Sequence, residues 1–272
     1  MKSDWLLAAR HIKRALALSI NRRGYRVQLC GSTFRVGYET RKGRQDRDYP
    51  LLKRLAQDRR CVFDVGANHG LASLVMSTTL ARDGQIYAFE ASEQACQIAR
   101  HNLALNGIAS RVQVINALVA DQTGEAVDFY WDHASGGASL IPGYLGHYEP
   151  IKKATLTLDA FIELQSLAPD FIKIDIEGAE GRALAGMRKI MTSTRPDVVV
   201  ELHSWQEMTV TDNAAQILEY LHTLGYQMIY LRTRSPVRDT QVLTGRGRCH
   251  VLLCPAESAL PGWLNDFDTS ML

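Results

Sequence analysis

The chain of 272 residues is 46% hydrophobic and 22% charged, with a formal net charge of +2. This composition is that of a globular protein with one sizeable core. It argues against a bilayer-spanning protein, because no apolar segment is long enough, and Arg10, His11, Lys13 and Arg14 interrupt any signal-peptide core. We therefore expect a cytoplasmic protein.

The first 60 residues are predicted to form a basic extension. Residues 4–20 have the pattern of an amphipathic helix, residues 25–38 that of a β-hairpin around Gly31-Ser32, and a helix is expected at 48–57. This region contains 16 Lys+Arg and 5 Asp+Glu. The excess favours contact with an acidic or phosphorylated substrate, a membrane surface or nucleic acid. A solvated basic face without a partner is the alternative.

From residue 61, apolar runs of strand length alternate with helical stretches. Strands are expected at 61–66, 85–90, 111–120, 170–178, 197–203, 226–232 and 248–254, and helices at 71–81, 93–107, 180–191 and 214–225. Such alternation predicts βαβ units and a mostly parallel sheet. The last two strands have no helix between them, so we expect an antiparallel pair at the sheet edge.

The predicted fold class is α/β, with a doubly wound, mostly parallel Rossmann-like sheet, an antiparallel edge strand and an N-terminal helix and hairpin extension. The expected parts are the extension 1–60, a core 61–256 and a tail 257–272. An irregular stretch at 132–150 interrupts the core, and such insertions are usually functional or mobile. The cysteines form no Cys-x-x-Cys pair and are expected to be thiols in a reducing compartment: Cys30, Cys61, Cys96, Cys249 and Cys254.

A glycine loop, Asp64-x-Gly66-x-x-x-Gly70, closes the first core strand and opens the next helix. Glycines there let the chain turn sharply and let a ligand approach the backbone. The spacing differs from that of a dinucleotide fingerprint, and Asp64 would repel a pyrophosphate at this helix start. The same carboxylate suits the sulfonium and ammonium groups of S-adenosylmethionine. The loop therefore favours that cofactor, with an NAD-dependent oxidoreductase as the alternative.

The second core strand ends in Glu90, 26 residues after Asp64. An acidic residue at this place can accept hydrogen bonds from both ribose hydroxyls of a bound nucleoside. Asn116 and Ala117, near the end of the third strand, lie where an adenine ring is expected. Together with the glycine loop, these positions predict a nucleoside pocket.

Four segments resemble the FkbM family of methyltransferases, over roughly residues 60–205. They are DVGANHG, FEASEQACQIARHNLALNG, TLDAFIELQSLAPDFIKIDIEGAEGRALAGM and RPDVVVELH. The resemblance implies S-adenosylmethionine as methyl donor and a hydroxyl acceptor, often on a sugar or secondary metabolite. It also implies cofactor contacts at Asp64, Gly66, Asn68, Gly70 and Glu90.

Ionisable residues cluster on two predicted strands. Alternation places Lys173, Asp175 and Glu177 on one face of a strand that should be apolar on both faces. Glu201 and His203 share a face of the next strand, and the carboxyl ends of such strands form the ligand crevice. We expect His203 or Asp175 to be the base that deprotonates the acceptor, and Lys173 to be held by the surrounding carboxylates.

Plainer interpretations stay open for these residues. Lys173 with Asp175 or Glu177 can be a structural ion pair, and His203 can simply end a strand. Glu180 is favoured by the helix dipole and needs no other role. The carboxylates and the histidine could hold Mg²⁺, but the sequence has no clear metal-ligand spacing, so no metal ligand is assigned.

The stretch 132–150 is expected to cover the acceptor side of the crevice, with polar tips at His133, Ser139, Tyr144, His147 and Tyr148. A loop packed on its own aromatics is the alternative. The expected acceptor is a hydroxyl of a small molecule or glycan, anionic ones included. Nucleic acid is disfavoured, because the basic residues are not interleaved with aromatics. A non-catalytic nucleoside-binding scaffold is the remaining alternative, and the oligomeric state is not indicated.

Overall fold

The computed structural model describes residues 23–42, 46–131, 138–141, 149–205, 207–270 and 272. The helix expected at 4–20 lies outside these ranges, as do His133, Tyr144, His147 and Tyr148. Among the described residues, no helix is both long enough and apolar enough to cross a membrane.

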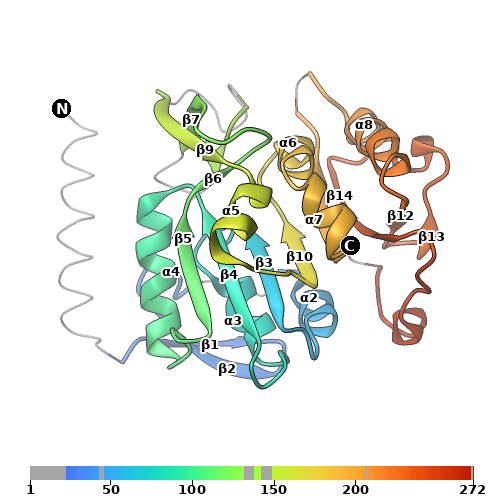
Figure 1. Ribbon diagram of the computed structural model, residues 1–272. Helices are drawn as coiled ribbons and strands as arrows, with labels where there is room; N and C mark the ends of the chain where they lie inside the picture. The colour runs from blue at the N-terminus through green and yellow to red at the C-terminus, as the bar shows by residue number, and fades with distance from the viewer. Residues whose placement is uncertain (1–22, 43–45, 132–137, 142–148, 206, 271) are drawn as a thin grey trace.

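An eight-stranded sheet forms the centre of the molecule, in the order β13-β12-β14-β11-β10-β3-β4-β5 (Figure 1). The five strands from β11 to β5 run parallel, which confirms the predicted fold class. The strand bounds are β3 Cys61–Val65, β4 Gln85–Glu90, β5 Val112–Asn116, β10 Phe171–Ile174, β11 Asp197–His203, β12 Tyr226–Tyr230, β13 Ser235–Pro236 and β14 Arg248–Pro255.

The antiparallel pair lies one position further in than expected. β14 pairs antiparallel with β12, as predicted, but it also pairs antiparallel with β11 and so occupies an interior position. The two-residue strand β13 forms the edge beyond β12. The reason is visible in β14 itself, where every residue after Arg248 is buried. A strand that is buried on both faces belongs between two neighbours.

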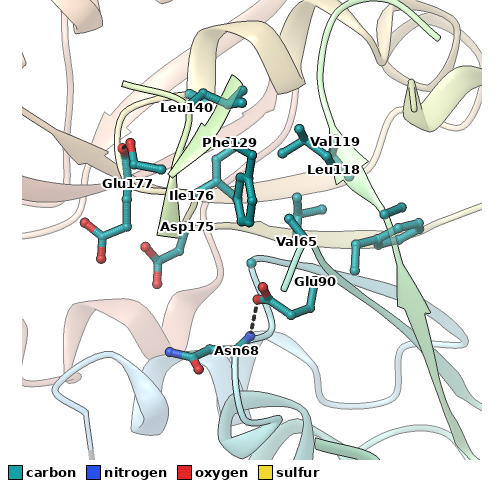
Figure 2. Close-up of a pocket in the computed structure, with 16 residues that line it drawn as sticks. Val65, Asn68, Glu90, Leu118, Val119, Phe129, Leu140, Asp175, Ile176 and Glu177 are labelled. Atoms are coloured by element: carbon teal, nitrogen blue, oxygen red, sulfur yellow. Dashed lines mark hydrogen bonds between the residues drawn. The ribbon is translucent and has the colours of Figure 1, made fainter. Parts of the chain in front are cut away.

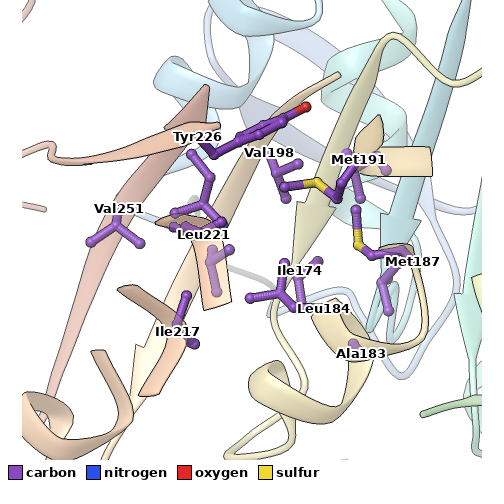
Figure 3. Close-up of a cluster of buried hydrophobic side chains, with 14 of the residues drawn as sticks. Ile174, Ala183, Leu184, Met187, Met191, Val198, Ile217, Leu221, Tyr226 and Val251 are labelled. Atoms are coloured by element: carbon purple, nitrogen blue, oxygen red, sulfur yellow. The ribbon is translucent and has the colours of Figure 1, made fainter. Parts of the chain in front are cut away.

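Helices cover both faces of the sheet. Alternate residues of the strands point to opposite faces and pack against the helices on each face. Phe63 and Ile172 belong to one buried cluster, whereas Val62 and Phe171 belong to the other. Figure 3 shows part of the first cluster, where Leu184, Met187 and Met191 pack near Ile174 and Val198. The first layer is formed by α5 Leu158–Gln165, α6 Glu180–Ala185, α7 Arg188–Ser193 and α8 Val210–His222, and the second by α2 Tyr49–Leu55, α3 Leu71–Ser77 and α4 Glu93–Leu105. Two short 3₁₀ helices are η1 Thr240–Leu243 and η2 Gly262–Asn265.

The predicted hairpin and the helix after it are confirmed. β1 Tyr25–Leu29 and β2 Ser32–Val36 pair antiparallel around a Cys30-Gly31 turn. The hairpin is bonded to α4, because Asn106 Oδ1 accepts from the amide of Arg35 at 2.9 Å and Asn102 Oδ1 accepts from that of Gly37 at 2.8 Å. Buried residues of β1, β2 and α2 belong to the second core cluster. The described part of the basic extension is thus packed into the main domain.

The strand expected at 111–120 is divided into two. Residues of β5 stay in the main sheet, whereas β6 Leu118–Val119 joins a four-stranded sheet with β9 Ile151–Leu156, β7 Ala126–Trp131 and β8 Ala138–Ser139. The division occurs where Asn116 Nδ2 and the amide of Ala117 both donate to the carbonyl of Glu90, at 3.0 and 3.1 Å. In Figure 1 this small sheet lies above the carboxyl ends of the central strands.

The helix expected at 180–191 is also divided, at Gly186. This residue ends α6, and a side chain there would place its Cβ 2.1 Å from the carbonyl oxygen of Ala120. The close approach of two backbones joins α6 to the start of the small sheet. The pattern of apolar residues along 180–191 does not reveal this contact between Gly186 and Ala120.

We therefore expect Gly186→Ala to destabilise the protein, because neither backbone can move away from the new methyl group. Overpacking of this kind costs about 1–3 kcal/mol, which for a domain of this size lowers Tm by roughly 2–4 °C per kcal/mol. Gly181→Ala, inside α6 with open space around the new Cβ, is the matched control. The control should keep or slightly raise Tm, since alanine favours helices. Equal melting temperatures for the two variants would contradict the packing argument.

Candidate functional site

A pocket of about 660 Å³ opens where the carboxyl ends of β3, β4 and β10 meet the small sheet. Its apolar part includes Leu118, Val119 and Phe129, and its polar part includes Glu90 and the residues that follow β10. Figure 2 shows the carboxyl groups of Glu90, Asp175 and Glu177 away from Leu118 and Val119. The pocket thus has an apolar end and an acidic end.

The glycine loop is held by backbone bonds to the neighbouring strand. The amides of Gly66 and Ala67 donate to the carbonyl of Phe89 at 2.9 and 3.0 Å. Gly66 has φ +79°, and a Cβ there would lie 1.8 Å from the carbonyl oxygen of Asp175. Only glycine fits at this point, because the loop and the end of β10 touch through their backbones.

Gly66 and Asn68 line the pocket, whereas Gly70 does not. Gly70 caps the start of α3, and a Cβ on it would meet Cβ of Ala99 in α4 at 3.2 Å. The absence of a side chain at Gly70 thus allows α3 and α4 to pack closely. The expected contact between Gly70 and the cofactor stays a prediction. Asn68 has φ +47° and donates its amide proton to Glu90.

Glu90 is fixed by two backbone donors. Its Oε2 accepts from the amide of Asn68 at 2.8 Å, and its Oε1 accepts from that of Ser92 at 2.7 Å (Figure 2). Burial raises the pKa of Glu90, and the two amide hydrogen bonds oppose this rise. The carboxyl group lines the pocket in an orientation set by the backbone. This is the place that the sequence predicted for a ribose contact.

The two residues expected near an adenine ring separate in the structure. Ala117 lines the pocket, but Asn116 does not. Asn116 donates to the carbonyls of Glu90 and Ala91, and its Oδ1 accepts from Lys153 at 3.0 Å. It therefore supports the end of β4 from outside the pocket.

Asp64 occupies a different place from the one expected. Its side chain is fully buried behind the glycine loop and lines neither described pocket. Oδ2 accepts from Ser73 Oγ at 2.6 Å, and Oδ1 lies 3.4 Å from Lys173 Nζ. The residue precedes the loop in a strand that runs under it, so its carboxylate faces the buried lysine. Direct contact with a cofactor stays a prediction, and the structure gives Asp64 a supporting position.

Lys173 is held by carboxylates, as the sequence suggested. Its ammonium group lies 3.4 Å from both Asp64 and Asp175 and donates to the carbonyl of Gly66 at 3.1 Å. Burial alone would lower the pKa of Lys173, but the charges of Asp175 and Asp64 raise it. The side chain is therefore a permanent cation that ties the glycine loop to the end of β10.

The face alternation predicted for 170–178 ends early. β10 stops at Ile174, and the chain then turns through Glu177 and Gly178, which have positive φ. Asp175 and Glu177 still converge with His203, because the turn brings them over the end of β11. His203 Nε2 lies 3.8 Å from Asp175 Oδ1, 3.6 Å from Glu177 Oε2 and 4.0 Å from Glu201 Oε2. The four expected residues are thus brought together, but by a turn and not by one strand face.

Glu180 does more than interact with the helix dipole, because its side chain contacts His203 and the backbone of Gly178. Its side chain is fully buried, with Oε1 accepting from the amide of Gly178 at 2.9 Å and lying 2.9 Å from His203 Nδ1. Burial would lower the pKa of His203, but Glu180, Asp175 and Glu177 raise it to about 9. In this arrangement the imidazole already holds a proton at neutral pH. Of the two expected bases, Asp175 lines the pocket and His203 does not, and the role of either as a base stays a prediction.

Sequence reasoning missed two residues beside this group. Asp48, before α2, and His250, in β14, approach within 3.8 Å of each other, and His250 Nε2 is also 3.8 Å from Glu201. A second pocket of about 510 Å³ contains Asp48 and shares Gly66, Asn68 and Asp175 with the first. The one available signal was His250 itself, a polar residue inside an otherwise apolar strand. Asp48 had no signal, because only the tertiary fold brings the N-terminal extension here.

Replacing Asp64 with Asn keeps the shape of the side chain and removes its charge. We expect Asp64→Asn to lower the free energy of unfolding by about 3–5 kcal/mol, because the buried Lys173 then lacks its one fully buried carboxylate partner among the described residues. The matched control is Asp83→Asn, which breaks an exposed ion pair with Arg60 and should cost at most about 1 kcal/mol. Urea denaturation of both variants measures the difference. A loss for Asp64→Asn as small as that of the control would show that the buried pair does not stabilise the fold.

Comparison with known proteins identifies the family. Residues 64–228 match the methyltransferase FkbM domain. Methyltransferase sdnD of Sordaria araneosa is 26% identical over 187 residues, 58% of this chain and 71% of that protein. The 2-O-methyltransferase NoeI of Sinorhizobium fredii is 26% identical over 151 residues, 49% of this chain and 60% of that protein.

Among solved structures, a methyltransferase FkbM from Methylobacillus flagellatus KT aligns with a TM-score of 0.47 and 18% identity, over 72% of this chain and 44% of that one. The chain thus spans less than half of the length of this structural neighbour and about three fifths of NoeI. The FkbM domain match covers more than half of the present sequence. The chain therefore belongs to the FkbM family of methyltransferases.

Proposed function

We propose that this protein transfers a methyl group from S-adenosylmethionine to a hydroxyl oxygen of a small molecule or glycan. The observation that carries the proposal is the Glu90 carboxyl group, which two backbone amides orient into the pocket at the end of β4. A carboxylate fixed in this way suits the paired hydroxyls of a ribose. The apolar residues Leu118, Val119 and Phe129 offer a surface for a flat ring.

The acidic end of the pocket suits the rest of the proposed cofactor. S-adenosylmethionine carries a sulfonium and an ammonium, and Asp175 and Glu177 line the same pocket as Glu90. A pyrophosphate would meet these carboxylates and be repelled, so the charge pattern disfavours a dinucleotide. The polar residues of the chain thus match a cationic nucleoside better than an anionic one.

The cofactor supplies an activated methyl group, so the protein mainly has to align the acceptor oxygen with it. Asp175 lines both neighbouring pockets and is in position to accept the proton of an acceptor hydroxyl. Lys173 and the protonated His203 stabilise Asp175 in its ionised form, and they lower its pKa despite burial. Glu201, whose pKa is raised by burial and by Asp175, lies further back and pairs with Arg248 at 3.0 Å.

The acceptor class is supported by the relatives and by the shape of the site. NoeI is named as a 2-O-methyltransferase, so a hydroxyl acceptor has a precedent within the sequence neighbours. The second pocket, which opens beside the loop and shares Asp175, offers room for such a molecule. Ser139 belongs to the stretch 132–150, which we expect to cover the acceptor side of the site. Its Oγ donates to the carbonyl of Glu177 at 2.8 Å, and the residue lines the first pocket.

Cofactor binding is tested first by thermal shift with S-adenosylhomocysteine, S-adenosylmethionine and NAD. The adenosyl ligands at about 100 times their Kd should add roughly 2.7 kcal/mol of stability, whereas NAD should add none. Glu90→Gln should weaken S-adenosylhomocysteine binding by about tenfold or more, because charge-assisted bonds contribute about 1.5–3 kcal/mol. Glu93→Gln, at the exposed start of α4, is the matched control and should bind normally. A shift with NAD alone would refute the proposed cofactor.

Methyl transfer to a hydroxyl is tested with a cofactor labelled in its methyl group and a panel of sugars and phenols. The product should be an ether that survives alkaline hydrolysis, which a methyl ester does not. Asp175→Asn should lower turnover by about 10²–10⁴-fold, while S-adenosylhomocysteine still binds; Asp83→Asn is the control. Labelling of RNA in place of these acceptors would contradict the proposed acceptor class. Cofactor binding without transfer to any acceptor would instead indicate a non-catalytic scaffold.

A further inference from the structure

We propose that Asp175, Glu177 and His203 form a binding site for a divalent cation of the Mg²⁺ or Mn²⁺ class. One ligand atom from each of the three residues lies within 4.8 Å of the others. Asp175 and Glu177 come from the turn after β10, and His203 is the last residue of the adjacent strand β11. No single stretch of sequence contains the site, so the sequence has no clear metal-ligand spacing for it.

The distances between His203 and the two carboxylates are longer than direct hydrogen bonds, and a cation could lie between these groups. His203 Nε2 is 3.8 Å from Asp175 and 3.6 Å from Glu177, distances beyond hydrogen-bond length. Oxygen and nitrogen ligands lie about 2.1 Å from Mg²⁺, so neighbouring ligands in an octahedron are roughly 3.0 Å apart. Asp175 and Glu177 are partly exposed, at 29% and 38% of their side chains.

The imidazole of His203 is already oriented as a metal ligand requires. Its Nδ1 lies 2.9 Å from Glu180 Oε1, and the amide of Gly178 fixes the same oxygen. A carboxylate that holds one ring nitrogen while the other faces the cation is the usual support of a histidine ligand. Glu180 is fully buried, so this support is part of the core.

A separate buried group points to a missing partner at this place. His250, in β14, lies beside Asp48 and Glu201, and its side chain is 91% buried. Its Nε2 makes no hydrogen bond among the described residues and lies 3.8 Å from Glu201 Oε2, which is 4.0 Å from His203 Nε2. A buried polar atom without a partner often marks an unseen water or ion. A water bound to the proposed cation would give this atom a partner.

The ligand atoms determine which kind of cation the site would hold. Asp175 and Glu177 would each supply an oxygen atom, and His203 would supply one nitrogen atom. Oxygen-rich ligands select Mg²⁺ or Mn²⁺ over softer ions. Three protein ligands would leave positions for other ligands, and two of the three residues, Asp175 and Glu177, also line the pocket. If the proposed function holds, the acceptor hydroxyl would lie beside these positions.

The test uses the full chain, stripped with a chelator, and Mn²⁺ as the probe. Equilibrium dialysis should find one Mn²⁺ per chain, displaceable by Mg²⁺. Glu177→Gln should weaken binding by about tenfold or more, since a charged ligand is lost. Glu219→Gln, an exposed residue of α8, is the matched control and should bind like the unmodified protein. Electron spin-echo spectra of bound Mn²⁺ should show imidazole nitrogen, and His203→Gln should remove that signal.

Two outcomes would overturn the site. One is the absence of stoichiometric Mn²⁺ binding, and the other is equal affinity in Glu177→Gln and Glu219→Gln. Because Glu177 is partly exposed, its variant should fold, and its Tm verifies this. Binding of S-adenosylhomocysteine is measured on the same samples, so loss of the metal site with the cofactor still bound removes only this inference. Failure of cofactor binding with Mn²⁺ still bound would instead remove the proposed function.

Discussion

A buried ammonium group joins the two central strands at the point where both leave the sheet. Nζ of Lys173 contacts the carbonyl of Gly66 and the carboxylates of Asp64 and Asp175. It thus fixes the glycine loop, the strand beneath it and the turn after β10 relative to one another. In a low-dielectric interior such a cation is tolerated only with close partners. The positions of the pocket residues depend on this arrangement.

The same junction explains why the residues around the pocket come from so many elements. Gly66 touches the backbone of Asp175, and Gly186 touches that of Ala120, so the loop, α6 and the small sheet approach without side chains between them. These contacts bring Glu90, Ala117, Asp175 and Glu177 into the lining of one cavity. The result is a pocket with an apolar end and an acidic end, suited to a cationic nucleoside.

The carboxylates near β10 and β11 form a network in which each ionisable group changes its neighbours. Glu180 holds His203, and Asp175, Glu177 and Glu201 surround the other ring nitrogen. A protonated imidazole cannot act as a base, which is why we propose Asp175 and not His203 as the proton acceptor. The proposed cation would take the place of that imidazole proton among the same carboxylates. With the cation bound, Asp175 would be one of its ligands and would no longer be the proton acceptor.

The sequence by itself determined the α/β fold class, the order of most strands and helices, and the family resemblance. It did so because periodicity and glycine spacing are local: Asp64, Gly66 and Glu90 stand at fixed distances along βαβ units. Only the tertiary structure decided that β14 lies inside the sheet, that the runs 111–120 and 180–191 divide, and that Asp64 faces Lys173. It also brought Asp48 and His250 to Glu201. These features depend on contacts between residues far apart in the chain, and local pattern carries no record of them.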